Sequence, residues 1–349
     1  MELWHGTEDW EAAQEELAAA GVTDGLPVVP PTRARVEQML KLHGYAVDEV
    51  VTALPPLFGD ATWQSIAINA VMAGCRPEYL PVVGAAVAAL AAPEFNLIGI
   101  ATTTGSAAPL IIVNGPIAMK IGMNAGGNAL GPGNRANATI GRAVSLMLRN
   151  VGGAMPGELD MATLGQPAKY TFCLAENEAA SPWPALHVER GFPAGASVVT
   201  VVGAAGIVEI VDSASHNAED LAQTFAQSML IAGSIGGGGF FGCGEPLILM
   251  PPEHAAAFTR CGYTKENVKA AIYERAVLPC DRLSAAVREQ LGRRAIDAAV
   301  GDVMRVAHQA DDLMIVVAGG VGVKAAFVPT WSGTTRAVSR LVRSGRSPD

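Results

Sequence analysis

Apolar residues recur at helical spacing along much of this chain, and short polar or glycine- and proline-rich turns separate the apolar segments. A repeat of apolar residues every three or four positions predicts amphipathic helices. The segments concerned are 10–20, 33–42, 60–73, 79–91, 217–232, 265–276 and 283–308, together with a helix that begins near Ala138. The segment 79–91 is apolar nearly all round, so we expect other elements to cover it on every side.

Four shorter apolar runs have the length of strands and do not alternate with polar residues, which is typical of a sheet buried on both faces. They are Asn96–Thr102, Pro109–Asn114, Glu245–Met250 and Leu313–Ala318. The last three each follow a helical segment and precede a glycine or proline turn, so they predict three α/β units.

Two further stretches, Lys169–Glu178 and Ser197–Val211, alternate apolar and polar residues, and we place them in a separate or inserted sheet. We therefore predict an α/β protein with several α/β units around a mostly buried sheet and an inserted β-rich part. The expected order is an N-terminal helical and proline-rich segment (1–58), a first α/β unit (59–160), the β-rich insert (161–212), the second and third α/β units (213–342) and a frayed tail (343–349).

The region from Ile121 to Arg142 is dense in glycine and asparagine and contains almost nothing that could fill a core. Glycine lets backbone amides approach a ligand closely, and asparagine side chains both donate and accept hydrogen bonds. A glycine loop that leads into a helix N-terminus, with Asn134 or Asn137 as the N-cap, is a general anion site. The alternative is a surface loop that ends in a capped helix. The residues expected to bind substrate here are Gly126, Gly127, Asn128, Asn134, Arg135 and Asn137.

Arg135 stands out in this loop because a positive charge at a helix N-terminus is unfavourable unless an anion shares it. We expect its guanidinium to point into the main pocket and to contact a carboxylate or phosphate of the substrate. The alternative is an ion pair with a structural carboxylate such as Glu158 or Asp160.

Two carboxylates, Glu176 and Glu178, stand two residues apart, so on a strand they would share one face with Tyr170. Adjacent carboxylates at a burial boundary repel each other, which raises the pKa of one of them and makes a general acid or base. Further charged and acid–base groups nearby in the chain are Lys169, His187, Glu189 and Arg190. A solvated loop with surface carboxylates is the alternative.

Two cysteines are candidate nucleophiles. Cys75 stands beside Arg76 near the start of a predicted helix, where a lowered pKa would activate the thiol, and Cys243 lies beside a run of four glycines. The alternative for both is packing as small buried side chains. Thr103, Thr104 and Ser106 follow a predicted strand, where open α/β sheets bind ligands, and turn chemistry accounts for them equally well.

Composition narrows the range of functions. The formal charge is −9 without a lysine- or arginine-rich cluster, which argues against nucleic acid as the main partner. The five cysteines show no CxxC spacing, and neither an HExxH nor a dinucleotide-binding motif is present, so we expect no metal and no cofactor. The N-terminus is acidic and does not resemble a signal peptide, and the apolar run 80–92 is too short to span a bilayer. We expect a cytoplasmic protein with no membrane partner. Half of the residues are hydrophobic and only 16 % are charged, which predicts a homo-oligomer, most simply a dimer.

Several stretches together resemble a bacterial family linked to selenoprotein-type domains with a Sec/Cys-Gly-Ser-Cys motif. They are TDGLPVVPPT, GCRPEYLPVV, GPGNRANATIGRA, KYTFCLAENEAASPW and LHVERGF, and the resemblance covers most of 22–330. Within them lie Cys75, Asn134, Arg135, Asn137, Lys169, Tyr170, Glu176, Glu178, His187, Glu189 and Arg190. After Gly319-Gly320 the chain has Val-Gly-Val-Lys-Ala-Ala where the family pattern has Gly-Lys-His-Ser, and no Sec/Cys-Gly-Ser-Cys segment follows. The resemblance therefore implies neither a particular reaction nor a thiol–selenol role.

Together these observations favour an enzyme that acts on a small anionic metabolite, as a hydrolase or lyase that breaks a carbon–heteroatom bond. The expected catalytic residues are Glu176, Glu178, His187, Cys75 and Lys169. Thr103, Thr104, Ser106, Tyr170 and Arg190 join the glycine-loop residues as expected substrate contacts. The alternative function, suggested by the five cysteines and twelve methionines, is a non-catalytic binding or carrier protein for a thiol-reactive or metal-bearing small molecule.

Overall fold

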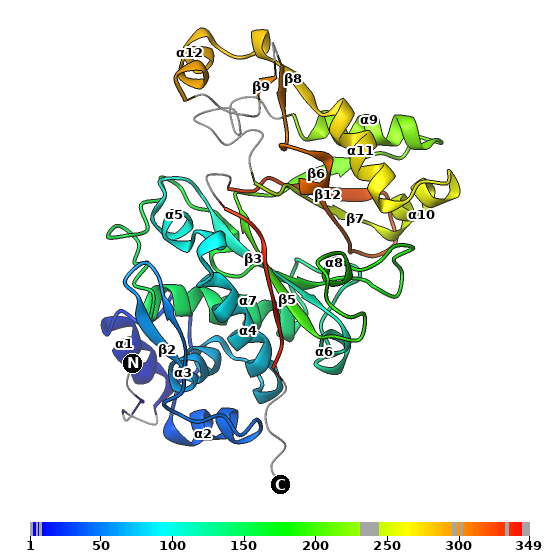
Figure 1. The fold of residues 1–349 in the computed structure, drawn as a ribbon. Helices are drawn as coiled ribbons and strands as arrows, with labels where there is room; N and C mark the ends of the chain where they lie inside the picture. The colour runs from blue at the N-terminus through cyan, green and yellow to red at the C-terminus, as the bar shows by residue number, and fades with distance from the viewer. Residues whose placement is uncertain are drawn as a thin grey trace.

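The computed structural model describes residues 3, 4, 6, 9–230, 244–294, 299–300, 303–331 and 335–343. Within these residues, helices and strands are mixed along the chain, and the strands form two sheets of four strands and two smaller sheets (Figure 1). The α/β prediction is confirmed.

The first large sheet has the order β13 (Val338–Leu341), β5 (Val198–Ala204), β3 (Ala108–Asn114) and β4 (Cys173–Ala175). β3 is parallel to β4 and antiparallel to β5, and β5 is antiparallel to β13. Every residue of β3, β4 and β5 is buried. As predicted, β3 is a continuous apolar run because both of its faces are covered.

The second large sheet has the order β11 (Met314–Val317), β7 (Leu247–Met250), β12 (Lys324–Val328) and β6 (Val208–Val211). β7 and β11 are parallel, and β12 is antiparallel to both β7 and β6. The predicted strands at 245–250 and 313–318 are confirmed as β7 and β11.

The two large sheets face each other, and helices cover their outer faces. Successive residues of a strand point to opposite faces. Accordingly Ile111 and Val113 of β3 join a core with helices, whereas Leu110 and Ile112 join a second core with residues of β7 and β11. Residues on the other face of β7 and β11, such as Ile248, belong to a third core with another group of helices. The result is four layers in the order helix, sheet, sheet, helix (Figure 1).

Apart from α10 (Pro252–Arg260), the helices of each outer layer lie in segments that the apolar periodicity predicts to be helical. On the first sheet, α4 (Leu80–Leu90) and α7 (Arg135–Asn150) pack against the strands, and α3 (Trp63–Ala73) packs against α7. On the second sheet lie α9 (Ala218–Ser228), α10 and α11 (Lys265–Arg275). All but one residue of α4 is buried, as expected for a helix that is apolar all round.

The remaining elements lie around these layers. Two small sheets pair β1 (Val50–Leu54) with β2 (Gly59–Thr62), and β10 (Val303–Arg305) with both β8 (Val277–Pro279) and β9 (Ala299–Val300). The other α-helices are α1 (Trp10–Ala19), α2 (Arg33–Lys41), α5 (Leu97–Thr102), α6 (Pro116–Lys120), α8 (Leu186–Glu189) and α12 (Ala285–Arg294). Short 3-10 helices span Pro77–Tyr79, Pro93–Phe95, Pro167–Lys169, Cys280–Arg282 and Ala310–Asp312.

Two predicted elements are wrong. The apolar run 96–102 forms the helix α5 and not a strand, because Asn96 adopts a left-handed conformation and its side chain accepts a hydrogen bond from Gly99 N as an N-cap. The region 283–308, expected to be largely helical, contains α12 followed by the strands β9 and β10. A short apolar run carries no periodicity that separates a helix turn from a strand.

The prediction of a separate or inserted sheet for the two β-rich stretches is wrong, because their strands pair with strands of both large sheets. β4 and β5 pair with β3 in the first sheet, whereas β6, only a few residues after β5, pairs with β12 in the second. The chain between β5 and β6 therefore crosses from one sheet to the other.

No single helix among the described residues is long and apolar enough to cross a membrane. One pair, Pro77–Leu90 with Pro93–Thr102, meets the length and composition criteria together but is bent by 74°.

A partly buried ion pair joins the N-terminal segment to the first helical layer. Asp24 accepts two hydrogen bonds from the Arg142 guanidinium on α7, at 2.7 and 2.8 Å, and Arg142 also donates to Pro27 O at 2.9 Å. Burial alone would raise the pKa of Asp24, but the hydrogen bond and charge of Arg142 outweigh it and lower the pKa. Two of the stretches behind the family resemblance thus meet at one ion pair.

Replacing Asp24 with Asn should lower the free energy of unfolding by about 2 kcal/mol, because hydrogen bonds to charged groups contribute about that much. Urea denaturation at neutral pH measures the effect. The matched control is Glu37→Gln, which removes an exposed pair with Arg33 at 3.7 Å and should change stability by less than about 0.5 kcal/mol. Equal effects of the two substitutions would contradict the structural role given to Asp24.

Candidate active site

The carboxyl ends of the parallel strands β3 and β4 bring two carboxylates to one amide. Asn114, the last residue of β3, donates from Nδ2 to Glu176 Oε2 at 2.6 Å and to Glu178 Oε1 at 3.0 Å. Gly115 N donates to the same Glu178 oxygen at 2.6 Å. The pairing of Glu176 and Glu178 predicted from their spacing is therefore found, although the strand before them is only three residues long.

The loop that follows β4 joins the two sheets at this point. Asn177 N donates to Val317 O, at the end of β11, at 2.7 Å. Further along, Leu186 N at the start of α8 donates to Glu176 Oε2 at 2.8 Å. Glu176 is thus held from two directions, by the strand β3 and by the returning loop.

The two carboxyl groups differ in environment. Glu176 is only 4 % exposed, whereas the Glu178 side chain is 33 % exposed. Burial raises the pKa of Glu176, and the neighbouring Glu178 adds to this, while the charge of Lys265 and the hydrogen bonds from Leu186 and Asn114 oppose it. A raised pKa favours the neutral form of Glu176, so the pair combines a buried carboxyl group of raised pKa with a second carboxyl group that solvent can reach.

Three polar atoms of this cluster are buried without a hydrogen-bond partner in the described part of the chain: Glu176 Oε1, Asn114 Oδ1 and His187 Nδ1. Buried polar atoms are nearly always satisfied, and exceptions concentrate where a proton, a water molecule or a ligand completes the site. All three belong to residues that are at most 4 % exposed.

His187, on α8, lies beside the accessible carboxylate. Its Nδ1 is 3.9 Å from Glu178 Oε1, and its Nε2 lies 3.3 Å from Ala194 O. A proton on Nε2 would be donated to this carbonyl, which leaves Nδ1 free to accept a proton on the side of Glu178. The structure therefore brings together three of the five residues predicted to be catalytic.

A second group of charges holds the loop in place. Lys265, on α11, is buried and donates to Pro184 O at 3.0 Å and to Glu189 Oε2. Lys269 donates to the other oxygen of Glu189 at 2.9 Å. Lys265, which the sequence shows only as one residue of a helix, thereby fixes α8 and the His187 it carries.

The glycine- and asparagine-rich loop uses its amides within itself. Asn134 is the N-cap of α7 and accepts from Asn137 N at 3.0 Å, so the first of the two predicted caps is confirmed. The Asn137 side chain donates to Asn124 O and Ala129 O, and Asn128 Nδ2 donates to Pro132 O. These side chains stabilise the loop conformation, which is the alternative to an anion site.

Close backbone contact explains why residue 320 is a glycine. Gly319 N, in the turn after β11, donates to Ala125 O at 2.9 Å. A Cβ atom placed on Gly320 would lie 2.8 Å from the Cα of Gly127, so a side chain at Gly320 would require the backbone to move. The loop thus packs against the second sheet.

Arg135 does not make the contacts predicted for it in the described structure. Its exposed side chain donates from Nε to Gly74 O at 2.9 Å. The alternative pairing with Asp160 is not found either, because Asp160 binds Lys169. The hydrogen bond to a carbonyl at the C-cap of α3 is a structural role that the sequence spacing does not reveal.

Cys75 is not suited to act as a nucleophile. It is buried, its Sγ donates to Thr139 O at 3.2 Å, and burial raises its pKa to about 12. Burial also raises the pKa of Cys173. A thiol with a raised pKa is not a thiolate at neutral pH. Cys243 lies outside the described residues.

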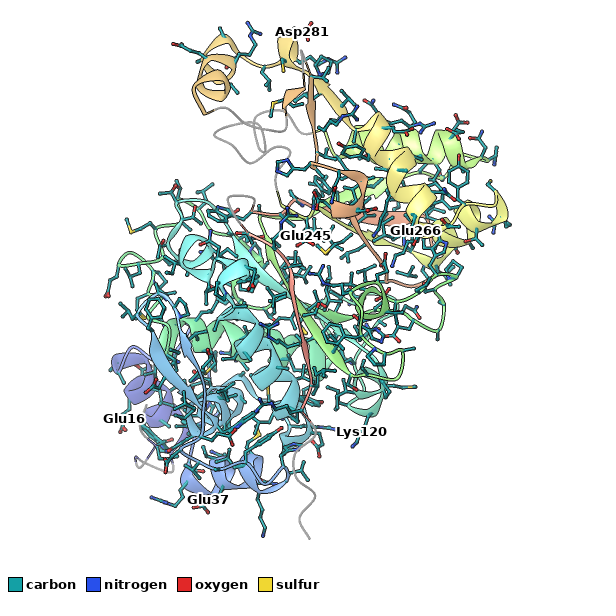
Figure 2. The ribbon with its side chains drawn as sticks, in the orientation of Figure 1. Glu16, Glu37, Lys120, Glu245, Glu266 and Asp281 are labelled. Atoms are coloured by element: carbon teal, nitrogen blue, oxygen red, sulfur yellow. The ribbon has the colours of Figure 1, made fainter. Side chains whose placement is uncertain are left out.

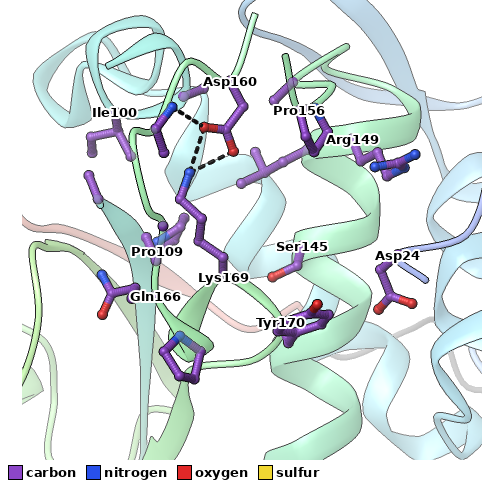
Figure 3. Close-up of a pocket in the computed structure, with 18 of the residues that line it drawn as sticks. Asp24, Ile100, Pro109, Ser145, Arg149, Pro156, Asp160, Gln166, Lys169 and Tyr170 are labelled. Carbon is purple, nitrogen blue, oxygen red and sulfur yellow. Dashed lines mark hydrogen bonds and ion pairs between the residues drawn. The ribbon is translucent and has the colours of Figure 1, made fainter. Parts of the chain in front are cut away.

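Lys169 and Tyr170 lie at the other end of the strands, beside a cavity of about 630 Å³ (Figure 3). Lys169 Nζ contacts both oxygens of Asp160, at 2.7 and 2.6 Å. Because these residues precede β4 and Glu176 follows it, the strand separates Lys169 from the carboxylates. Lys169 therefore does not share a site with Glu176 and Glu178.

The remaining predicted contacts serve the fold. Thr103 Oγ1 accepts from Gly105 N, which is the turn chemistry given as the alternative. The backbone Thr104 O accepts from Thr163 N, and Ser106 Oγ donates to Ala205 O, so these two residues make long-range contacts within the fold. Arg190 pairs with Glu245 at 3.2 Å, and Glu245 also accepts from Ala337 N. Figure 2 shows Glu245 at the level where the two sheets meet.

Asn114 is a residue of the candidate site that the sequence pattern does not single out. Its one signal is its position, as a polar residue at the end of a buried apolar run and before Gly115-Pro116. No three His, Cys, Asp or Glu side chains in the described ranges lie close enough together to hold a metal ion.

Comparisons of the chain with protein-family models, with curated proteins and with solved structures give no significant match.

Proposed function

We propose that this protein is an enzyme in which Glu178 moves a proton to or from a small polar substrate, in a hydrolysis or lyase step that breaks a carbon–heteroatom bond. The observation that carries the proposal is the single amide of Asn114 that binds both Glu176 and Glu178. It holds a buried acid next to an accessible carboxylate, which is the division of roles that acid–base catalysis uses.

Each group has a defined part in this proposal. Glu178 Oε1, oriented by Gly115 N and Asn114, is the oxygen that exchanges a proton with a substrate or with an attacking water. His187 Nδ1, 3.9 Å away, accepts or returns that proton. The pKa of Glu176 is raised by burial, which favours its neutral form and so reduces the negative charge beside Glu178.

The substrate need not be an anion in this proposal. Arg135 and the asparagines expected to bind one donate to backbone carbonyls of the protein. A carboxylate as the proton-transfer group favours a neutral or cationic reacting group beside it, because a second negative charge would be repelled.

The carrier alternative has less support. It predicts that Cys75 or Cys243 faces a cavity. Cys75 is buried and burial raises its pKa to about 12, and Cys243 lies outside the described residues.

A metabolite-depletion experiment tests the proposal while the substrate is still unidentified. Wild-type protein and Glu178→Gln are each incubated with a mixture of small polar metabolites, and mass spectrometry follows the composition. The proposal expects at least one compound to be consumed, with its cleavage products appearing, by the wild-type protein alone. Consumption at equal rates by both proteins would overturn it.

A further inference from the structure

The cavity beside Lys169 has the size of a small-molecule site. Its volume of about 630 Å³ falls within the range of about 300–1,000 Å³ that is typical of ligand pockets. It lies between α7, the amino end of β3 and the chain segment 154–170, as Figure 3 shows. None of the groups proposed for proton transfer lines it.

Most of the cavity wall is apolar. The apolar lining residues include Ile100, Pro109, Leu148, Ala162 and Leu164. Leu164 is 97 % exposed and stands at the rim. Such a wall suits the apolar body of a ligand, since burial of apolar surface is favourable in proportion to its area.

The charges around the cavity are not fully paired. Of its two carboxylates, Asp160 is neutralised by Lys169 and Asp24 by Arg142. A fifth charge, Arg149 on the last turn of α7, lines the cavity and has no carboxylate partner among the described residues. The five charged side chains around the cavity therefore include one more positive than negative charge.

The hydrogen bonds of Arg149 are also incomplete. Its Nη2 donates to Gly21 O at 3.2 Å, and its Nε is buried without a partner in the described ranges. A guanidinium offers five N–H donors in a planar fork that matches a carboxylate or a phosphate. The helix C-terminus explains why a cation is tolerated at this position, but it does not supply the missing acceptor.

We propose that this cavity binds a small amphipathic anion, with its single carboxylate or phosphate group on Arg149 and its apolar body along the wall formed by Ile100, Pro109 and Leu148. The site is separate from the Glu176–Glu178 pair, because β4 lies between them. The inference therefore stands independently of the proposed reaction.

Isothermal titration calorimetry with three probes of equal chain length tests this site. The probes are octanoate, octyl phosphate and 1-octanol, each below its aggregation concentration. We expect at least one of the two anions to bind to the wild-type protein about tenfold or more tightly than the alcohol. Charge-assisted hydrogen bonds to the anion account for this gain in affinity. The better anion identifies the headgroup. Equal binding of all three probes, or no binding of either anion, would overturn the proposal.

Variants locate the binding. Arg149→Gln should remove the preference for the anion and leave octanol binding unchanged, while Arg149→Lys should keep part of the preference and show that the fold tolerates change at this position. Ala162→Phe, on the outer wall, should weaken the binding of all three probes, because the larger side chain fills part of the cavity. Glu178→Gln should bind every probe like the wild type. Unchanged anion binding in both Arg149→Gln and Ala162→Phe, or its loss in Glu178→Gln, would place the ligand elsewhere and contradict the proposal.

Discussion

Glu178→Gln is expected to lower kcat/KM on the substrate by about 10²–10⁴-fold, the range that a positioned general acid or base contributes. The glutamine amide has nearly the same shape and can still accept hydrogen bonds from Gly115 N and Asn114 Nδ2. It cannot take up a proton. Steady-state kinetics with the substrate found by metabolite depletion measures the loss, and the thermal midpoint of the variant should stay close to that of the wild type.

The same substitution at the neighbouring residue should have a much smaller effect. Because its raised pKa favours a neutral Glu176, Glu176→Gln resembles the state that the residue already occupies. Glu209→Gln, an exposed residue of β6, serves as the control that should leave turnover unchanged. Full turnover in Glu178→Gln, or an equal loss in the Glu176 and Glu178 variants, would contradict the roles assigned to the pair.

The second large effect is expected on stability. Glu189→Ala should lower the free energy of unfolding by about 3–5 kcal/mol, the cost of removing one partner from a buried ion pair. The side chain of Lys265 is 1 % exposed, and Pro184 O would be its remaining hydrogen-bond acceptor among the described residues. Urea denaturation followed by circular dichroism measures the change.

Two further variants separate the buried charge from the loss of a surface contact. Lys269→Met should cost less than Glu189→Ala, because Lys265 still pairs with Glu189 and the Lys269 side chain is more exposed. Glu274→Ala, on the exposed side of α11, should change stability by less than about 0.5 kcal/mol. If Glu189→Ala behaves like Glu274→Ala, Lys265 is not held by a structurally important pair.

Much of the fold follows from local patterns in the sequence. β3, β7 and β11 are continuous apolar runs followed by turns, and the helices that cover the sheets show apolar residues on the faces they bury. The order of strands does not follow from such patterns. β5 and β6 are adjacent in the chain yet belong to different sheets, because pairing with β3 or with β12 depends on partners distant in the sequence.

The candidate site, like the fold, follows only in part from local patterns in the sequence. The spacing of Glu176 and Glu178 is local, and it is enough to predict that they lie together. The role of Asn114 depends on the parallel pairing of β3 with β4, and the role of Lys265 depends on α11 packing over the loop 177–192. The sequence near Asn114 or near Lys265 predicts neither of these contacts.

The glycine- and asparagine-rich loop shows why composition misleads at this level. The same glycines that permit contact with a ligand also permit contact with another part of the backbone, and here Gly127 meets Gly320. Asparagines that can bind an anion can equally cap a helix and brace a loop, as Asn134 and Asn137 do.

The central claim is that Asn114 binds two carboxyl groups, of which the buried one, Glu176, has a raised pKa that favours its neutral form. A pH titration of the glutamate side-chain carboxyl carbons by ¹³C NMR tests it directly, with Glu176→Gln to assign the resonance. Because burial raises its pKa, we expect the Glu176 carboxyl to remain protonated through the pH range in which ordinary glutamates ionise, and to lose its proton only at higher pH. The claim is contradicted if the resonance that disappears in Glu176→Gln titrates at or below the ordinary glutamate pKa.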